Sequence, residues 1–279
     1  MKKISRRSFL AAAGLSVAAL ALTACGGSSA STASSVASSA ASSEAASTSA
    51  AAGELTTVEA GKLTMATNAA FPPYEMTTDA GEFEGIDIET AQAIADKLGL
   101  ELQIDDMDFD AALLSVQQGQ ADIVMAGVTV TDERKAVMDF SNSYATGIQS
   151  IIVPEGSDIA SPDDLAGKKI GTQRGTTGYI YCYDDFGDDS VVAYDDGLTA
   201  VQALNNGQVD AVVIDNAPAK EFVAANPGLV ILDTSYAEED YAIGMAKGSS
   251  LEDAVNAALE ELKADGTLQS IVDKYITAE

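Results

Sequence analysis

Three short segments carry groups suited to binding a small charged molecule. Arg134 follows Thr129 by five residues, and its guanidinium can make two parallel hydrogen bonds to a carboxylate. The turn Gly175-Thr176-Thr177-Gly178 follows an expected strand and opens an expected helix, so its free N–H groups suit an anion. Asp215 ends another expected strand and supplies a carboxylate. Together these segments offer groups for an anion and a carboxylate for a cation.

Each group also has a purely structural interpretation. Thr131-Asp132-Glu133-Arg134 is a credible capping segment, which would leave Arg134 on the surface at the start of a helix. Asp215 would equally suit the N-cap of the helix that follows it. Turns such as 175–178 join many strands to helices. The residues alone therefore leave both binding and capping open.

The composition excludes several kinds of active site. The chain contains no histidine, which is the commonest general base and the commonest metal ligand. Ser-His-Asp and Cys-His catalysis are therefore excluded, and a zinc site is not expected. The two cysteines are Cys25 and Cys182, and Cys182 is expected to be a small buried thiol. We expect no metal and no cofactor.

The first 25 residues have the pattern of an export signal. Four basic residues within 2–7 precede an apolar run over 9–22 that is too short to span a bilayer. Leu22-Thr23-Ala24-Cys25 then forms a lipobox, which predicts removal of 1–24 and acylation of Cys25, with firm attachment to a membrane through two or more acyl chains. The alternative is an ordinary cleaved signal with a chance cysteine. Because Arg6-Arg7 resembles a twin-arginine motif, general secretory and twin-arginine export both stay open.

Residues 26–53 are almost wholly Ser, Ala, Thr and Gly. Such a segment buries too little apolar surface to offset its ordering entropy, so a disordered tether is expected. Its root-mean-square reach is about 30 Å. Cys25 and this tether would hold the rest of the chain at the outer face of the cell membrane.

The chain is strongly acidic. It has 15 Lys and Arg against 43 Asp and Glu, and removal of 1–24 would leave 11 against 43, a formal charge of −32. A charge of this sign argues against nucleic acid and other polyanionic partners. It could steer cationic ligands, but a solvated acidic surface explains it as well.

The elements that must position the charged groups alternate between strand and helix after residue 54. Strands are expected over 62–67, 101–104, 121–126, 149–153, 169–172, 191–194 and 209–214, and helices over 87–98, 109–118, 177–186, 197–205, 217–225, 251–263 and 268–275. This alternation is typical of βαβ units with a parallel sheet, whose ligand sites lie at the carboxyl ends of strands. About 225 residues allow one large domain or two small ones, and the periodicity does not choose between them.

Five motifs follow one another along the chain. They are Phe71-Pro72-Pro73-Tyr74-Glu75, Gly85-Ile86-Asp87-Ile88-Glu89, Ala126–Arg134 leading to Asp139-Phe140-Ser141, Gly175–Gly178, and Val209–Asp215. Together they resemble the polar amino acid family of periplasmic-type solute-binding proteins, which includes glutamine, arginine and lysine/arginine/ornithine receptors. The likeness covers about residues 57–276 without large gaps.

The resemblance implies an α/β fold of two lobes, in which parallel-rich sheets are flanked by helices. This is the type II periplasmic binding protein fold, with a two-strand hinge and the ligand clamped between the lobes. Lobe one would comprise 54–145 and 240–279, and lobe two 146–239. The hinge strands would pass near 144–146 and 237–241.

The resemblance also carries ligand-binding roles over to ten positions. They are Asn68, Phe71, Phe109, Gly127, Thr129, Arg134, Gln173, Thr176, Thr177 and Asp215. Arg134, Thr129 and Thr177 would hold the carboxylate of the ligand. Asp215 and the carbonyl of Gly127 would hold its ammonium.

Aromatic and amide side chains would surround the side chain of the ligand. Phe71 and Phe109 match the aromatic walls of the family and would cover its aliphatic stem. Asn68 stands where many relatives carry Asp, and Gln173 stands where the residue varies with specificity. These amides favour a polar uncharged side chain, or a cation bound partly by neutral acceptors.

The resemblance implies a monomeric receptor, not an enzyme, that passes a free amino acid to the permease and ATPase of an ABC importer. Glutamine, arginine and other polar amino acids stay open. An acidic ligand is the least expected, because Glu75 and Asp87 lie near and Arg174 is the only spare base, which could equally face solvent. One alternative is an enzyme on the same fold, similar to the cyclohexadienyl dehydratases. Another is a module that senses the ligand without transport.

Overall fold

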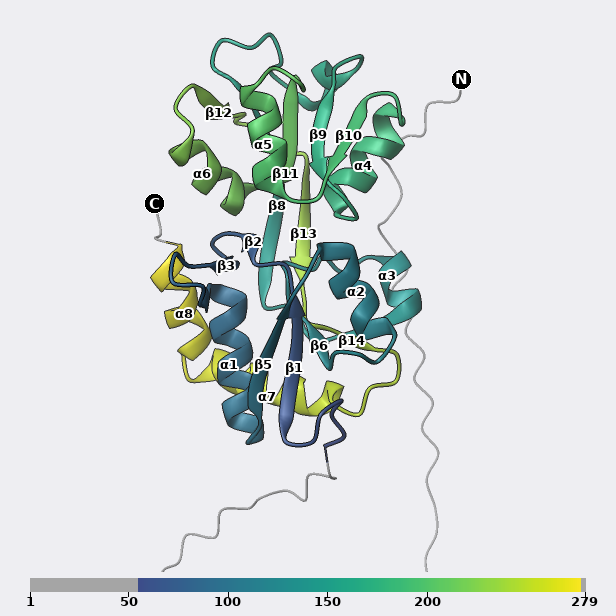
Figure 1. Cartoon of the computed structure of the whole chain (residues 1–279), viewed down its shortest axis with the longest axis vertical. Coiled ribbons are helices and arrows are strands. Elements are labelled where there is room, and N and C mark those ends of the chain that lie inside the picture. Colours follow the sequence, from purple (N-terminus) through teal and green to yellow (C-terminus); the bar gives the residue numbers. More distant parts are fainter. Residues whose placement is uncertain (1–54, 277–279) are drawn as a thin grey trace, which may run out of the picture. The chain divides into compact units, whose positions relative to one another are not determined.

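A computed structural model describes residues 55–276, and Figure 1 labels their helices and strands. The expected signal segment 1–24, the lipidation site Cys25 and the tether that follows it lie outside the described residues. Within 55–276, no helix combines the length and the apolar character needed to cross a membrane.

The first sheet has five strands in the order β5-β1-β6-β14-β7. Its strands are β1 (Lys62–Thr67), β5 (Glu101–Asp106), β6 (Ile123–Val124), β7 (Met138–Phe140) and β14 (Gly244–Ala246). The helices beside it are α1 (Ile86–Leu98), α2 (Phe109–Gln117), α3 (Asp132–Val137), α7 (Glu252–Ala264) and α8 (Thr267–Tyr275). α1, α7 and α8 pack against one another, whereas α2 packs on β1, β6 and β14 (Figure 1).

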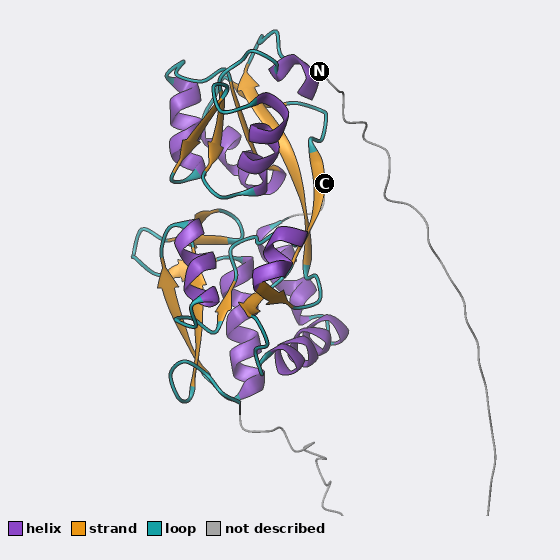
Figure 2. Cartoon of the chain, turned by 90° about the vertical axis from the view of Figure 1, so that its right-hand side faces the viewer, coloured by secondary structure: helices purple, strands orange, loops and turns teal. Residues whose placement is uncertain are grey.

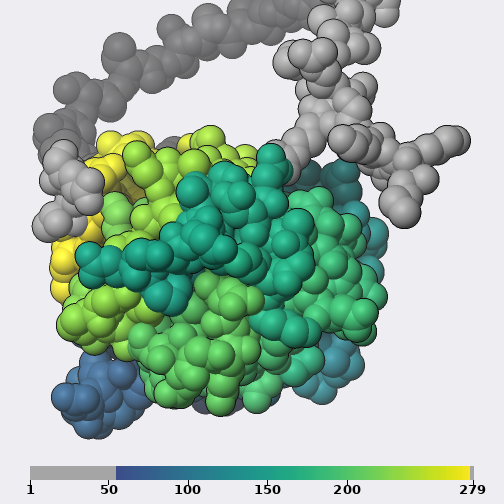
Figure 3. All heavy atoms as spheres, turned by 90° about the horizontal axis from the view of Figure 1, so that it is seen from above, coloured from purple at the N-terminus to yellow at the C-terminus, as the bar shows by residue number. Residues whose placement is uncertain are grey.

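The second sheet has the order β10-β9-β11-β8-β12, and β13 pairs with the remaining length of β8. Its strands are β8 (Ala145–Pro154), β9 (Ile170–Gln173), β10 (Val191–Tyr194), β11 (Ala211–Asp215), β12 (Leu229–Ile231) and β13 (Ala237–Tyr241). The helices beside it are the short 3₁₀ helix η1 (Pro162–Leu165), α4 (Thr177–Phe186), α5 (Gly197–Asn205) and α6 (Asn216–Ala225). Figure 3 looks onto this part of the molecule, coloured teal to green.

Two antiparallel strands, β8 and β13, pass between the two groups of elements (Figure 2). Their pairing ends at Ala145 and Tyr241, and Tyr241 forms a further bridge to Thr129 near the first sheet. A third, small sheet of β2 (Ala70–Phe71), β3 (Glu75–Thr77) and β4 (Phe83–Glu84) lies at the start of α1. The chain therefore leaves the first sheet after β7, builds the second, and returns to the first as β14.

Several expected elements have the observed bounds, among them the strands 62–67 and 191–194 and the helices 177–186 and 197–205. One expectation was wrong. The strand expected over 121–126 is only Ile123–Val124, because the chain turns away at Gly127, where φ is +54°. Beside their parallel pairs, the two sheets contain antiparallel pairs formed by β8, β13 and β14, because the chain crosses between the sheets twice. Cys182 is a buried free thiol, as expected.

Candidate ligand-binding site

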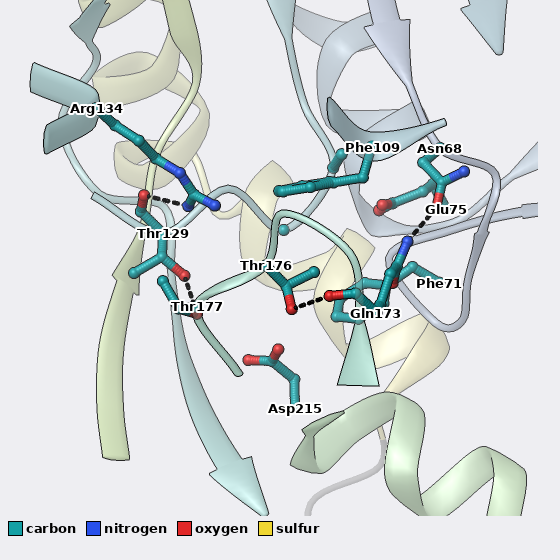
Figure 4. A pocket seen from close by; sticks show the side chains of 12 residues that line it. Asn68, Phe71, Glu75, Phe109, Thr129, Arg134, Gln173, Thr176, Thr177 and Asp215 are labelled. Carbon is teal, nitrogen blue, oxygen red and sulfur yellow. Dashed lines mark hydrogen bonds between the residues drawn. The ribbon is translucent and has the colours of Figure 1, made fainter. Parts of the chain in front are cut away.

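A pocket of about 310 Å³ lies where the ends of the two sheets meet (Figure 4). All ten residues expected at the site line it, together with Glu75 and Ala126. They come from the small strands β2 and β3, from loops after β1 and β6, from the starts of α2, α3 and α4, and from the carboxyl ends of β9 and β11. The fold thus gathers residues that are up to 147 positions apart in the sequence.

Arg134 is buried, so the interpretation as a surface residue was wrong. Only 8% of it is exposed, and its guanidinium donates to the carbonyls of Thr129 (2.8 Å) and Gly175 (3.1 Å). It also lies 5.3 Å from the ring centre of Phe109, a cation–π distance. The capping segment is real as well, because the Thr131 side chain accepts the Arg134 backbone N–H. Burial lowers the pKa of Arg134, but a guanidinium keeps its charge.

The turn between β9 and α4 is held in place by its own residues. Gly175 has φ +75°, and a Cβ there would lie 2.6 Å from Asp110 Oδ1, so glycine is required for the close approach. Thr176 donates to the carbonyl of Gln173 (2.8 Å) and accepts the backbone N–H of Tyr179 (3.3 Å). Thr176 therefore lines the pocket and caps α4.

The side chain of Asp215 does not cap α6, so the alternative role of Asp215 as an N-cap is ruled out. Its carboxyl accepts hydrogen bonds from Gln149 Nε2 (2.8 Å) and from the hydroxyl of Tyr241. Burial raises its pKa to about 7, and the hydrogen bond from Tyr241 opposes that shift. A buried carboxyl with so high a pKa gains from a cationic partner.

Glu239 is a site residue that the sequence reasoning missed. It lies on β13 and is 6% exposed. Its Oε2 accepts from the hydroxyls of Thr129 (3.2 Å) and Thr177 (2.9 Å) and from Gln149 Nε2 (3.0 Å). A hydroxyl has one hydrogen to donate, so neither threonine hydroxyl can donate a second hydrogen bond while it donates to Glu239. The signal was weak, since Glu239 is one of three adjacent acids in an expected hinge strand.

The other end of the pocket is built from amides and a carboxyl. Gln173 Nε2 donates to Asn68 Oδ1 (2.8 Å) and to the carbonyl of Asp195 (3.3 Å), while Asn68 Nδ2 donates to the carbonyl of Met107 (2.9 Å). Glu75 lines the pocket with 0% exposure, and neither of its oxygens accepts a hydrogen bond from the described residues. Burial, nearby Asp87 and other carboxylates raise its pKa well above the ordinary value.

Gly127 and Arg174 make contacts outside the pocket. Gly127 donates its backbone N–H to Asp87 Oδ2 (3.0 Å), behind the pocket. Arg174 has a side chain that is 53% exposed, lies 3.8 Å from Asp195 and does not line the pocket. Within 55–276 the pocket lining therefore contains one cation, Arg134, and two carboxyls, Glu75 and Asp215.

The family model for bacterial extracellular solute-binding proteins, family 3, matches residues 63–278. The chain belongs to this family. The predicted family and the two-sheet α/β fold of type II binding proteins are therefore confirmed. The family acts outside the cytoplasm, and so does this member.

Among curated relatives, the L-cystine-binding protein TcyJ of Escherichia coli K12 is 33% identical over 226 residues, which cover 79% of this chain and 85% of TcyJ. Among solved structures, an ancestral arginine-binding protein bound to arginine is 42% identical, with a TM-score of 0.74, and the match covers 77% of this chain and 98% of that one. The structure described as an ancestral arginine-binding protein bound to glutamine is 41% identical, with a TM-score of 0.75, and covers 78% and 99%. These relatives are named as binding proteins, not as enzymes.

Proposed function

We propose that this chain captures a free amino acid with a cationic side chain, of the arginine type, and delivers it to an ABC importer. The observation that carries the cationic side chain is the Glu75 carboxyl, which is fully buried in the pocket wall without a hydrogen-bond donor. A buried carboxylate is costly unless it is paired. A cationic side chain on the ligand would supply such a partner.

The carboxylate and the ammonium of the ligand pair with the other two charged residues of the pocket, Arg134 and Asp215. Its carboxylate pairs with Arg134, whose guanidinium lies beside the N-terminus of α4. Its ammonium pairs with Asp215, which sits at the carboxyl end of β11. With both charges paired, Glu75 is the carboxylate left over, and a zwitterion with a neutral side chain leaves it unpaired.

The amides near Glu75 suit a cation as well. Gln173 uses its amide N–H groups on Asn68 and on the Asp195 carbonyl, which leaves its Oε1 as an acceptor. A guanidinium carries five N–H donors and needs several acceptors in one place. The aromatic rings of Phe71 and Phe109 also line the pocket and would cover the aliphatic stem.

Glutamine is the second candidate. A protonated Glu75 would donate to a neutral amide, and the raised pKa of Glu75 favours that form in the empty site. The arginine-binding relative that was solved with glutamine bound shows that such a pocket in that protein accepts a neutral amide. The two candidates differ in the charge on Glu75.

Calorimetry tests the proposal. Purified protein is titrated with arginine, lysine, glutamine and cystine, and arginine is expected to bind with micromolar or tighter affinity. Glu75→Gln is expected to weaken the binding of arginine by about 10- to 100-fold, because charged hydrogen bonds contribute ~1.5–3 kcal/mol. Glutamine is expected to bind this variant still. Glu84→Gln, an exposed glutamate on the adjacent strand β4, is the matched control. Binding of glutamine without any binding of arginine would overturn the proposal.

The remaining parts of the function follow the family. We propose that Cys25 carries the lipid anchor, that the protein is a monomer, and that the lobes are 54–145 with 240–279 and 146–239. The position of β8 and β13 between the two sheets supports those boundaries. Incubation with prephenate separates a receptor from a cyclohexadienyl dehydratase, since formation of phenylpyruvate would show an enzyme.

A further inference from the structure

Two buried carboxyl groups lie on neighbouring segments at the pocket, one in its lining and one behind it. Glu75 on β3 and Asp87 in the first turn of α1 both have 0% exposure. The segments that carry them are in close contact, because the Asp87 N–H donates to the carbonyl of Tyr74 (2.8 Å). A Cβ on Gly85 would lie 2.2 Å from that carbonyl oxygen, so glycine at 85 permits the approach.

The donors near the pair are unequally shared. Asp87 Oδ2 accepts the Gly127 N–H, which lowers the pKa of Asp87 against the effect of burial, while its Oδ1 accepts no hydrogen bond from the described residues. Glu75 accepts no hydrogen bond from the described residues. A proton on Glu75 turns this orphaned acceptor into a donor toward Asp87, and the pair then carries one negative charge instead of two.

The other titratable groups around the pair do not supply a cation. The acids that raise the pKa of Glu75 are Asp87, Asp106 and Asp215, and Glu75 and Asp87 in turn raise the pKa of Tyr74 and Tyr144. Arg134 lies in the same pocket, but its guanidinium is held by the Thr129 and Gly175 carbonyls and faces the proposed carboxylate position. Among residues 55–276 the proton is therefore the cation available to the empty site.

We propose that Glu75 and Asp87 share one proton in the empty receptor, that a cationic ligand side chain displaces this proton, and that a neutral one leaves it in place. This inference rests on the proposed binding of a cationic amino acid. On binding, the Glu75 O–H bond breaks, the proton leaves to water, and the carboxylate pairs with the ligand. The pocket thus chooses between arginine and glutamine according to pH.

The pH dependence has a definite sign. Acid favours the protonated empty site and so weakens the binding of arginine, whereas glutamine binds without displacing this proton. The ratio of the arginine to the glutamine association constant should therefore rise with pH, by up to about tenfold per unit, until Glu75 ionises in the empty protein. Asp215 also loses a proton when the α-ammonium binds, but both ligands share that effect, so it cancels in the ratio.

Calorimetry in two buffers of different ionisation enthalpy, at about pH 6, counts the protons released. Arginine is expected to release about one proton more than glutamine from the wild type and from Glu84→Gln. The difference should vanish in Glu75→Gln. If glutamine does not bind, the comparison is arginine on the wild type against arginine on Glu75→Gln, and if the variant does not fold, the pH dependence of the wild-type ratio decides.

Two outcomes overturn this inference alone. One is arginine binding with the same proton count as glutamine and a ratio that is flat with pH. The other is an extra proton that persists in Glu75→Gln, which would assign it to another group. Failure of arginine to bind at any pH would instead overturn the proposed function.

Discussion

At the scale of single residues, the site offers a buried guanidinium and a buried carboxyl, which we propose to pair with the two charges of an amino acid. Arg134 and Asp215 are both less than a tenth exposed, and each is fixed by hydrogen bonds before any ligand arrives. Such preorganised groups lose little entropy on binding. Glu239 holds the hydroxyls of Thr129 and Thr177, so the carboxylate of the ligand must rely first on Arg134 and on backbone N–H groups.

Arg134→Ala is expected to weaken amino acid binding by at least about 30-fold, because loss of one partner of a buried charge pair costs ~2–5 kcal/mol. Arg174→Ala is the matched control, since that arginine is exposed and lies outside the pocket. Titration calorimetry with arginine measures both variants. Equal affinities for Arg134→Ala and Arg174→Ala would refute the carboxylate-binding role.

At the scale of elements, the two strands β8 and β13 join the parts of the site. Gly147 on β8 pairs with Glu239 on β13, and its missing side chain leaves room for the ring of Tyr241. Tyr241 is fully buried and donates to Asp215. Packing between the crossing strands therefore sets the position of the Asp215 carboxyl.

Gly147→Ala tests this packing. A Cβ at 147 would lie 2.4 Å from the ring of Tyr241, so the ring or the strand must shift. Overpacking of this kind typically costs ~1–3 kcal/mol of stability. We expect a lower melting temperature and weaker ligand binding, because the movement reaches Asp215. Ile148→Ala, at a residue that is 40% exposed, is the control, and an unchanged affinity in Gly147→Ala would separate the strand packing from the site.

At the scale of the whole molecule, negative charge is concentrated around the pocket and over the chain. Among the described residues, Glu75 and Asp215 line the pocket with one arginine, Asp87 and Glu239 are buried beside it, and the sequence carries a formal charge of −28. The empty protein therefore contains buried acids without enough cations, and ligand binding supplies part of the missing charge. Stability and binding should depend on pH together.

The ligand-free protein is expected to lose stability as the pH rises from mildly acidic to neutral. Burial raises the pKa of Asp87 to about 6 and that of Asp215 to about 7, from an ordinary value of 3.8. A carboxyl with a raised pKa holds its proton more tightly in the folded state. Its contribution is complete below the unfolded pKa and is lost as the pH rises through the folded pKa, on the order of 3 kcal/mol per group.

Thermal melts between about pH 4 and pH 8 measure this loss. Melts at raised salt separate it from general repulsion among surface acids, which salt screens. With saturating arginine the decline should be smaller, because the ligand pairs with Asp215 and its binding stabilises the folded state. A melting temperature that stays flat or rises over this range without ligand would contradict the expectation.

The sequence alone determined the family, the alternation of strands and helices, and the ten positions that line the pocket. These follow from local pattern and from motifs, because a strand-end aspartate or a glycine turn is visible without its neighbours. The N-terminal signal, Cys25 and the tether also follow from local pattern, and they remain expectations. The short strands β2–β4, β7 and β14 were missed, because two or three residues give no periodicity.

Only the tertiary structure decided whether Arg134 and Asp215 serve as helix caps or as buried pocket residues. Arg134 is both part of a capped helix and a buried guanidinium, and Asp215 is at an N-cap position without capping. The burial of Glu75, Asp87 and Glu239 was not visible in the sequence, since the chain has 43 acidic residues and only the fold distinguishes these few. Burial is a property of the assembled fold, because it depends on strands and helices far away in the sequence. The charge of the ligand's side chain is therefore inferred from packing around Glu75, not from the residues that first suggested a binding site.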